Sequence, residues 1–189
     1  MDIKLIIIIA FSYFYAFLEI FMSVRQRRKR KVVESGDRWS IWILGISIAI
    51  GYSLSFSLAA SKTGRIYHWD TPFVIGSLLV ITGLIIRIAS ILTLKKQFTY
   101  TVTKIENHEL IETGLYKYIR HTGYLGQLII FLGIATSLSN WLSVLLMMVS
   151  VFIGYINRIM VEEKFMIQQF GQKFVDYQRR TKRLIPTIF

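Results

Sequence analysis

From Thr122 to Asn157 the sequence runs for 36 residues without a charged side chain. As one α-helix this run would be about 54 Å long, far more than the ~30 Å hydrocarbon core of a bilayer. The polar stretch Ser137-Leu-Ser-Asn140 lies near its middle and provides a turn. The run therefore predicts a hairpin of two membrane helices, over about residues 122–138 and 141–160.

Three further apolar runs precede this hairpin, at about residues 3–24, 39–61 and 72–94. Each run is long enough to cross a bilayer as a helix. The first run does not fit a cleaved signal peptide, because its basic cluster follows the apolar residues and no small-residue cleavage site is present. We therefore expect an all-α integral membrane protein with five transmembrane helices, forming a single membrane domain over residues 1–189.

The composition excludes several other classes of protein. Hydrophobic residues make up 53% of the chain, which rules out disorder, yet the formal net charge is +12. Apolar spans with basic flanks combine both properties, whereas nucleic-acid binding would explain the charge and not the apolar runs. The absence of cysteine excludes a disulfide-linked scaffold and a cysteine-ligated metal site.

The basic residues predict the orientation of the chain in the membrane. Eighteen Lys and Arg residues fall in the segments 25–38, 95–121 and after residue 160, against Lys4, Lys62 and Arg65 on the other side. By the positive-inside rule the N-terminus lies outside and the C-terminus in the cytoplasm. We expect a multi-pass protein of a prokaryotic cell membrane, or of the endoplasmic reticulum membrane in a eukaryote.

Two of the cytoplasmic segments carry the polar chemistry. Residues 98–105 are β-branched and aromatic, which favours an extended conformation. Apolar residues recur at helical spacing from Val161 to Arg180, which predicts an amphipathic helix that continues the fifth span. We expect segment 95–121 and this C-terminal helix to form a cytoplasmic cap.

Charged residues at membrane depth are candidates for function, because burying them costs several kcal/mol unless they are paired or hydrated. Arg87 lies inside the third span, and Arg158, Glu162 and Glu163 lie where the fifth span leaves the bilayer. Arg158 and Glu162 share one helical face, so a simple salt bridge between them is the alternative interpretation. The sequence leaves the role of Arg87 and the partner of Glu163 open.

Motifs of soluble enzymes are absent from the sequence. There is no G-x-G-x-x-G, no G-x-x-x-x-G-K-[ST] and no G-x-S-x-G, and the three histidines are scattered along the chain. We therefore expect no metal site and no nucleotide site of the soluble type.

Two blocks together resemble a known family. Gly114-Leu-Tyr-Lys-Tyr-Ile-Arg-His-Thr-Gly-Tyr-Leu-Gly126 is similar to the G-P-Y-x-x-x-R-H-P-x-Y-x-G block of the isoprenylcysteine carboxyl methyltransferases. The second block resembles the family's R-x-x-x-E-E … F-G … Y … R-x-I-P ending, with Arg158-Ile-Met-Val-Glu-Glu163, Phe170-Gly171, Tyr177 and Arg183-Leu-Ile-Pro186. His108-Glu-Leu-Ile111 matches the H-x-L-[VI] that precedes the first block, so the resemblance covers a catalytic region of about residues 80–186.

The sequence departs from the family pattern at three positions. Leu115 and Thr122 stand where the family has proline, and Phe174 stands where a tyrosine is common. The two lost prolines remove no ionisable group, and the departures affect the assignment of the substrate more than that of the cofactor.

The resemblance implies a membrane methyltransferase that uses S-adenosylmethionine, releases S-adenosylhomocysteine and methylates the carboxylate of a prenylated cysteine or another lipid-like acid. It places Arg158 towards the substrate carboxylate, with Glu162 as the second catalytic position. It places cofactor contacts at Thr101, His108, Glu109, Leu110, Ile111, Tyr116, His121, Thr122, Gly123, Tyr124 and Glu162.

These residue types suit the chemistry that the resemblance implies. An acid such as Glu162 can accept hydrogen bonds from a ribose or an ammonium group, and Tyr116 and Tyr124 can pack on the adenine or face the sulfonium. An extended segment at 108–111 can offer backbone groups to the adenine edge, and His121 at a helix N-terminus can receive a carboxylate. A prenyl chain would arrive laterally from the lipid, and the cofactor from the cytoplasm.

Three other functions remain as alternatives. A methyltransferase for phospholipid amines would use the same cofactor site, although a cationic Arg158 suits an anionic acceptor better. Membrane sterol reductases share a similar C-terminal block and use a nicotinamide cofactor, but their chains are much longer. A small scaffold without enzymatic activity is the third. The true methyl acceptor, the source and the oligomeric state are not determined by the sequence.

Overall fold

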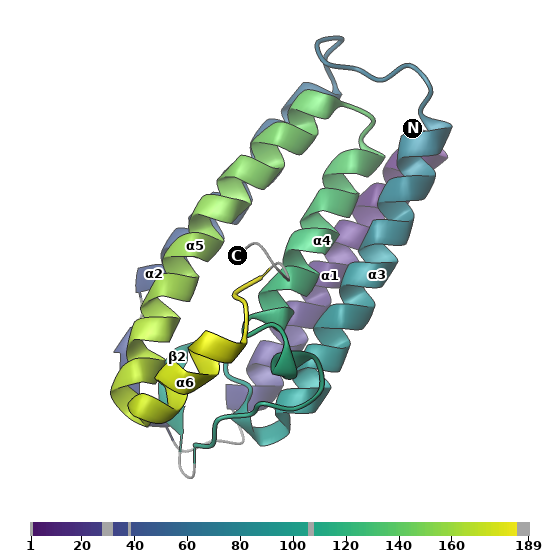
Figure 1. Ribbon diagram of the computed structural model, residues 1–189. Coiled ribbons are helices and arrows are strands. Elements are labelled where there is room, and N and C mark those ends of the chain that lie inside the picture. Colours follow the sequence, from purple (N-terminus) through teal and green to yellow (C-terminus); the bar gives the residue numbers. More distant parts are fainter. Residues whose placement is uncertain (1, 28–31, 38, 106–107, 185–189) are drawn as a thin grey trace.

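The computed structural model describes residues 2–27, 32–37, 39–105 and 108–184, and within them the chain is mostly helical (Figure 1). The predicted basic residues at 28–31 and 38, and Pro186, lie outside the described residues. Five long helices run side by side: α1 (Ile3–Arg27), α2 (Trp39–Ala59), α3 (Asp70–Leu94), α4 (Thr122–Ser137) and α5 (Trp141–Phe170).

Four of the described helices, α1, α2, α3 and α5, are long and apolar enough to cross a membrane. The shorter apolar helix α4 has 16 residues, which correspond to about 24 Å, less than the ~30 Å of a hydrocarbon core. These apolar helices indicate that the chain is an integral membrane protein.

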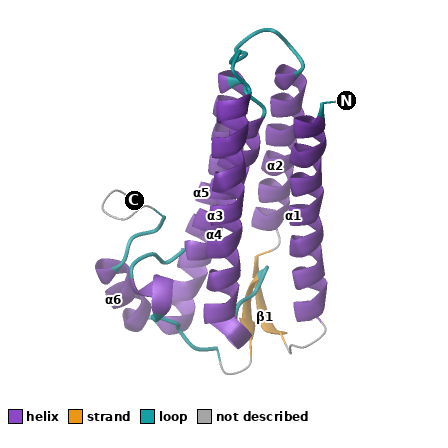
Figure 2. Ribbon diagram, turned by 90° about the vertical axis from the view of Figure 1, so that its right-hand side faces the viewer, coloured by secondary structure: helices purple, strands orange, loops and turns teal. Residues whose placement is uncertain are grey.

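A small sheet lies at one end of the bundle, so the expectation of an all-α protein is wrong in this detail (Figure 2). Strand β1 (Val32–Asp37) pairs antiparallel with β2 (Val102–Ile105), with Val32 opposite Ile105 and Asp37 opposite Val102. The β-branched residues of β2 favour an extended backbone, whose hydrogen-bonding groups then require a partner strand. The connection between α1 and α2 supplies that strand.

The C-terminal segment forms two helices where the sequence predicted one. Helix α5 ends at Phe170, and α6 (Gln172–Arg180) follows after Gly171. Gly171 has a φ of +54°, a conformation that glycine adopts without a steric penalty. The chain therefore changes direction here, which buries Phe174 and Tyr177 of α6.

Close backbone approach joins α3 to α4, and serine hydrogen bonds join α2 to α5. A side chain at Gly83 would come within 2.7 Å of the Gly126 carbonyl oxygen. Ser143 Oγ donates to the Ser55 carbonyl at 2.7 Å, and Ser55 Oγ to the Ser143 carbonyl at 2.8 Å. Small and hydroxylated residues pack membrane helices in this way, because lipid gives no hydrophobic force between them. The bundle thus consists of two close helix pairs.

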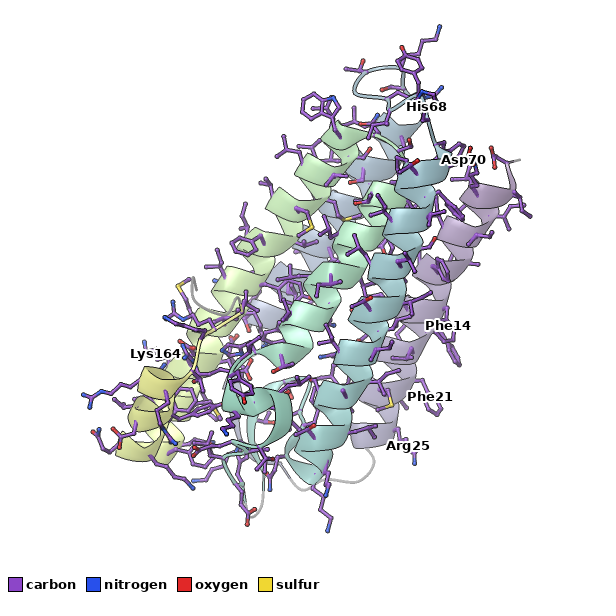
Figure 3. The ribbon with its side chains drawn as sticks, turned by 45° about the vertical axis from the view of Figure 1, so that its right-hand side comes forward. Phe14, Phe21, Arg25, His68, Asp70 and Lys164 are labelled. Carbon is purple, nitrogen blue, oxygen red and sulfur yellow. The ribbon has the colours of Figure 1, made fainter. Side chains whose placement is uncertain are left out.

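Helix α1 lies against these two pairs and presents an apolar face to its surroundings. Figure 3 shows Phe14 and Phe21 pointing away from the bundle, and they are 53% and 51% exposed. Arg25 and Lys164 lie towards one end of the molecule, and His68 and Asp70 lie at the other. This separation of a central apolar surface from polar ends is that of a membrane protein.

Candidate functional site

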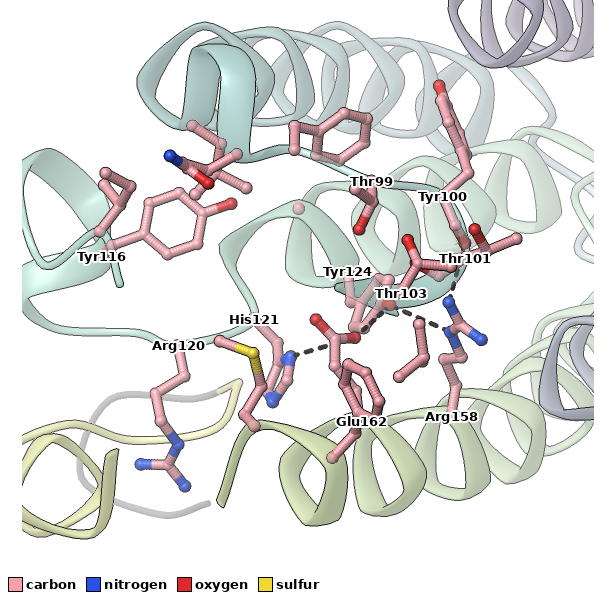
Figure 4. A pocket seen from close by; sticks show the side chains of 18 of the residues that line it. Thr99, Tyr100, Thr101, Thr103, Tyr116, Arg120, His121, Tyr124, Arg158 and Glu162 are labelled. Atoms are coloured by element: carbon pink, nitrogen blue, oxygen red, sulfur yellow. Dashed lines mark hydrogen bonds and ion pairs between the residues drawn. The ribbon is translucent and has the colours of Figure 1, made fainter. Parts of the chain in front are cut away.

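A cavity of about 210 Å³ opens at the end of the bundle that holds the sheet and α6 (Figure 4). Residues from all six α-helices, from β2 and from the two short 3₁₀ helices η1 (Lys95–Gln97) and η2 (Gly114–Lys117) line it. The ionisable and hydroxyl-bearing aromatic side chains in the lining are Glu19, Arg87, Tyr100, His108, Glu109, Tyr116, Arg120, His121, Tyr124, Arg158, Glu162 and Tyr177. Charged groups from distant parts of the sequence therefore meet in one cavity.

Tyr124 and Glu162 are the closest contact between the two predicted motif blocks. The Tyr124 hydroxyl donates to Glu162 Oε2 at 2.5 Å, and it accepts from Arg158 Nε at 3.3 Å. His121 stacks on the Tyr124 ring, with its Nδ1 4.0 Å from Glu162 Oε2. The start of α4 and the site end of α5 thus bring His121, Tyr124, Arg158 and Glu162 together.

Arg158 is only 2% exposed, and neutral oxygen atoms surround its guanidinium group. Its Nη1 donates to Ser40 Oγ at 2.6 Å and its Nη2 to the Tyr100 carbonyl at 2.8 Å. The alternative of a direct salt bridge to Glu162 is not what the structure shows among the described residues, because the Tyr124 hydroxyl lies between the two groups. The positive charge of Arg158 therefore lines the cavity without contacting a carboxylate of the described residues.

Asp37 fixes the end of α2 that carries Ser40. Its carboxylate accepts from the backbone N–H groups of Trp39 at 2.9 Å and of Ser40 at 2.8 Å. Burial raises the pKa of Asp37, but these hydrogen bonds with Ser40 and Trp39 outweigh it and lower the pKa below its usual value. Asp37 thus holds Ser40 in place to accept from Arg158.

Glu163, whose partner the sequence left open, contacts three side chains, of which Arg120 and His121 also line the cavity. Its carboxylate accepts from Arg120 Nε at 2.9 Å and from Arg183 Nε at 3.0 Å, and His121 Nε2 lies at 3.3 Å. Unlike Glu162, Glu163 is not part of the lining. The two adjacent acids therefore act on different faces of α5.

Segments 98–121 and 171–184 contact each other across the end of the cavity. The backbone N–H of Arg120 donates to the Lys182 carbonyl at 2.8 Å, and that of His121 to the Arg183 carbonyl at 3.1 Å. The Tyr177 hydroxyl donates to the Tyr116 carbonyl at 2.7 Å. Both segments thus cover the cavity as one connected unit.

Tyr116 stands inside this unit, and its side chain reaches α3. Its hydroxyl lies 2.9 Å from Ser90 Oγ. Burial raises the pKa of Tyr116 to about 12, although the Ser90 hydrogen bond lowers it in part. The hydroxyl is therefore neutral at physiological pH.

Most of the residues predicted for the site line the cavity: Thr101, His108, Glu109, Leu110, Ile111, Tyr116, His121, Gly123, Tyr124, Arg158 and Glu162. Thr122 is the exception. It is 1% exposed, and its hydroxyl donates to the Ile119 carbonyl at 2.8 Å. Its side chain therefore serves the start of α4 and does not face the cavity.

Sequence reasoning missed Glu19 and left the role of Arg87 open, and both residues line the cavity. Arg87 Nε and Nη2 donate to the two carboxylate oxygens of Glu19 at 2.8 and 2.9 Å. Glu19 is the one acid inside the first apolar run, and this is the signal that could have marked it. Ile41, Leu44 and Gln127 also line the cavity and carried no signal of their own.

No group of three or more His, Cys, Asp or Glu side chains suited to a metal ion occurs in the part of the chain that the structure describes.

Comparison with known proteins gives consistent matches. A family model described as phospholipid methyltransferase matches residues 71–173. The protein-S-isoprenylcysteine O-methyltransferase B of Arabidopsis thaliana is 32% identical over 124 residues, which is 65% of this chain and 62% of that protein. A probable protein-S-isoprenylcysteine O-methyltransferase of Oryza sativa is 32% identical over 149 residues, covering 78% of this chain and 76% of the relative.

A solved structure is similar as well. It is described as the eukaryotic intramembrane Ras methyltransferase, isoprenylcysteine carboxyl methyltransferase. It matches with a TM-score of 0.61 and 26% identity, over 76% of this chain and 52% of that chain. The chain thus spans about half of this structure and about 62% of the Arabidopsis relative.

Proposed function

This chain belongs to the phospholipid methyltransferase family and, within it, to the isoprenylcysteine carboxyl methyltransferases, and we propose that it methylates the carboxylate of a prenylated cysteine or a similar lipid acid. The methyl donor in this proposal is S-adenosylmethionine. The observation that carries the proposal is the single cavity in which His121, Glu162 and Arg158 meet.

The groups in the cavity fit S-adenosylmethionine, which combines a sulfonium cation, an amino-acid zwitterion, a ribose and an adenine. Glu162 is 31% exposed, and Tyr124 occupies its Oε2, which leaves Oε1 to accept from ribose hydroxyls or an ammonium group. Tyr116 and Tyr124 offer aromatic faces to the adenine or the cation. When bound, S-adenosylmethionine supplies an electrophilic methyl group.

Two further elements complete the proposed cofactor site. Residues 108–111 line the cavity and can present backbone groups to the adenine edge. His121 precedes the first turn of α4, where backbone N–H groups favour a carboxylate. Segments 98–121 and 171–184 would then act as the cap that excludes water from the bound cofactor.

The acceptor needs no general base, because a carboxylate is already ionised at neutral pH. The work of the chain is alignment, and Arg158 supplies a buried positive charge with no carboxylate partner among the described residues. Among the described residues, three of its five N–H groups donate hydrogen bonds, which leaves two for an acceptor. A contact to one acceptor oxygen leaves the other oxygen free to attack.

The proposed orientation places the N-terminus outside and the site end of the bundle at the cytoplasmic leaflet. The basic residues Lys95, Lys96 and Lys164 belong to that end. Five membrane crossings, of which α4 is the shortest, place the N-terminus and the site end on opposite sides of the membrane. Ile41 and Leu44 of α2 give the cavity an apolar wall for a lipid chain, whereas the cofactor would come from the cytoplasm.

The test is to measure binding and product with the purified protein in detergent. Titration with S-adenosylhomocysteine should show saturable binding, and NADPH should show none. With labelled S-adenosylmethionine and N-acetyl-S-farnesylcysteine, the product should release labelled methanol in base, because methyl esters hydrolyse there. No binding of S-adenosylhomocysteine would overturn the proposal.

A phospholipid amine is the second candidate acceptor, because the matching family model carries that description. An N-methylated product is stable in base, so the same assay separates the two. The positive charge of Arg158 in the cavity wall opposes an ammonium acceptor. We therefore expect a panel of prenylcysteine, fatty-acid and amine lipids to show turnover on the acids.

A further inference from the structure

Glu19 and Arg87 form a buried ion pair in the wall of the cavity. Their side chains are 16% and 3% exposed, and both belong to the lining. The two parallel hydrogen bonds, at 2.8 and 2.9 Å, have the forked geometry in which arginine binds a carboxylate most tightly. The cavity thus contains a carboxylate-binding site on Arg87, which Glu19 of the same chain occupies.

Arg87 lies near Arg158, the residue proposed to hold the acceptor carboxylate. Arg158 Nη2 donates to the Tyr100 carbonyl, and the Arg87 guanidinium lies 5.7 Å from the centre of the Tyr100 ring. Two arginines that line the cavity therefore lie close to Tyr100, Arg158 at its carbonyl and Arg87 near its ring. Glu19 neutralises one of them, and no carboxylate of the described residues contacts the other.

Glu19 belongs to a helix with few buried side chains to hold it in place. Ile8 and Tyr15 are the buried residues among the described side chains of α1. Polar contacts fix the helix at three levels: Lys4 with Asp70 at the far end, Tyr15 with Gln127 midway, and Glu19 with Arg87 at the site. Beyond Tyr15 no described side chain of α1 is buried, so loss of the contact between Glu19 and Arg87 would leave this end of the helix weakly held.

We propose that Glu19 occupies the position on Arg87 that the acceptor carboxylate takes during the reaction. An anionic lipid then displaces Glu19 as the end of α1 moves aside. This inference rests on the proposed function. It makes Glu19 a specificity-determining residue, because one oxygen of a lipid carboxylate can replace Glu19 as the partner of Arg87 while the other oxygen stays free to attack. A neutral or cationic lipid cannot replace it without leaving Arg87 buried and unpaired.

The first test measures the affinity for an acid and for its neutral analogue. Glu19→Gln removes the competing charge, so the KM for N-acetyl-S-farnesylcysteine should fall by about tenfold. The KM for S-adenosylmethionine should not change, and neither should inhibition by the corresponding carboxamide. Glu19→Asp keeps the charge, but its shorter side chain weakens the two hydrogen bonds to Arg87. The KM for the acid should therefore fall by less.

Lys4→Gln is the matched control on the same helix. It removes the other ion pair between α1 and α3, whose atoms are 2.5 Å apart, at the opposite end of the molecule. The KM for the acid should remain at the wild-type value. If Glu19 were only a structural counter-ion, Glu19→Gln would raise the KM for the acid or leave it unchanged, and either result would overturn the inference.

The second test does not depend on turnover. The chain has no cysteine, so spin labels can be placed at Phe21→Cys on α1 and Leu92→Cys on α3, which are 51% and 66% exposed. When N-acetyl-S-farnesylcysteine is added, a second and longer distance between the labels should appear. The carboxamide should not produce it. In the Glu19→Gln background the longer distance should appear without any lipid.

The two proposals fail in different ways. If the wild-type protein binds no S-adenosylhomocysteine and methylates nothing, the proposed function fails, and the label distances still report whether an acid displaces Glu19. If the wild-type protein is active but the acid leaves the label distances unchanged, the displacement of Glu19 fails and the methyltransferase proposal stands.

Discussion

At the scale of single residues, the Tyr124 hydroxyl joins the two charged groups of α5 that the sequence singled out. It donates to Glu162 and accepts from Arg158, so neither charge contacts the other directly. This separation allows the two residues to face different ligands in the proposed reaction. Glu162 is 31% exposed to the cavity, whereas the arginine is anchored by Ser40 and Tyr100.

This division of roles leads to a prediction about two alanine variants. Glu162→Ala should weaken S-adenosylhomocysteine binding by about tenfold or more, because it removes hydrogen bonds to a charged acceptor. Arg158→Ala should leave that affinity within about twofold and reduce turnover on N-acetyl-S-farnesylcysteine. Calorimetric titration and initial rates measure the two effects. An equal loss of cofactor affinity in both variants would contradict the division.

At the scale of elements, the break between α5 and α6 determines where the C-terminal segment lies. Gly171 has a φ of +54°, and its N–H donates to the Ile167 carbonyl at 2.8 Å. The following turn brings Phe174 and Tyr177 into the cavity lining. A straight continuation of α5 would have carried these aromatic residues away from η2 and the Tyr116 carbonyl.

The break can be tested with two glycine variants. Nothing lies within 4 Å of a Cβ added at Gly171 or at Gly45 of α2, but only Gly171 has a positive φ. Gly171→Ala should therefore destabilise the protein by about 1–2 kcal/mol. Gly45→Ala should be neutral or stabilising, because alanine favours a helix. Thermal unfolding in detergent compares them, and an equal effect would show that the left-handed turn is not needed.

At the scale of the whole molecule, small and hydroxylated residues hold the two close helix pairs together, whereas ion pairs help to hold the end with the site. Glu163 connects α5 to Arg120 before α4 and to Arg183 after α6. A buried acid with two arginine partners is costly to leave incomplete. This carboxylate therefore adds a charged link to the backbone hydrogen bonds that already join the covering segments.

Neutralising Glu163 should loosen the segments that cover the cavity. Glu163→Gln should increase hydrogen exchange at residues 181–184 and weaken S-adenosylhomocysteine binding by about tenfold. Asp176→Asn is the control, because Asp176 is 52% exposed and its ion pair with Arg179 spans 3.8 Å on the surface. Faster exchange spread over the whole bundle would instead indicate general destabilisation.

The sequence by itself determined the features that depend on neighbours along the chain. Uncharged runs located the long helices and β-branched residues at 98–105 located β2. Most of the site residues that the family resemblance selected line the cavity. These properties follow from the length, hydropathy and backbone preference of contiguous segments, which a sequence displays directly. The family resemblance relied on the same local spacing.

Only the tertiary structure decided which side chains meet. Glu19 and Arg87 are 68 positions apart, and Ser40 and Arg158 are 118 positions apart. Strand β1, the turn at Gly171 and the exclusion of Thr122 from the cavity also depend on what lies opposite in space. A buried charge or an open strand edge takes the partner that helix packing brings within hydrogen-bonding distance, and that distance is not encoded in local hydropathy.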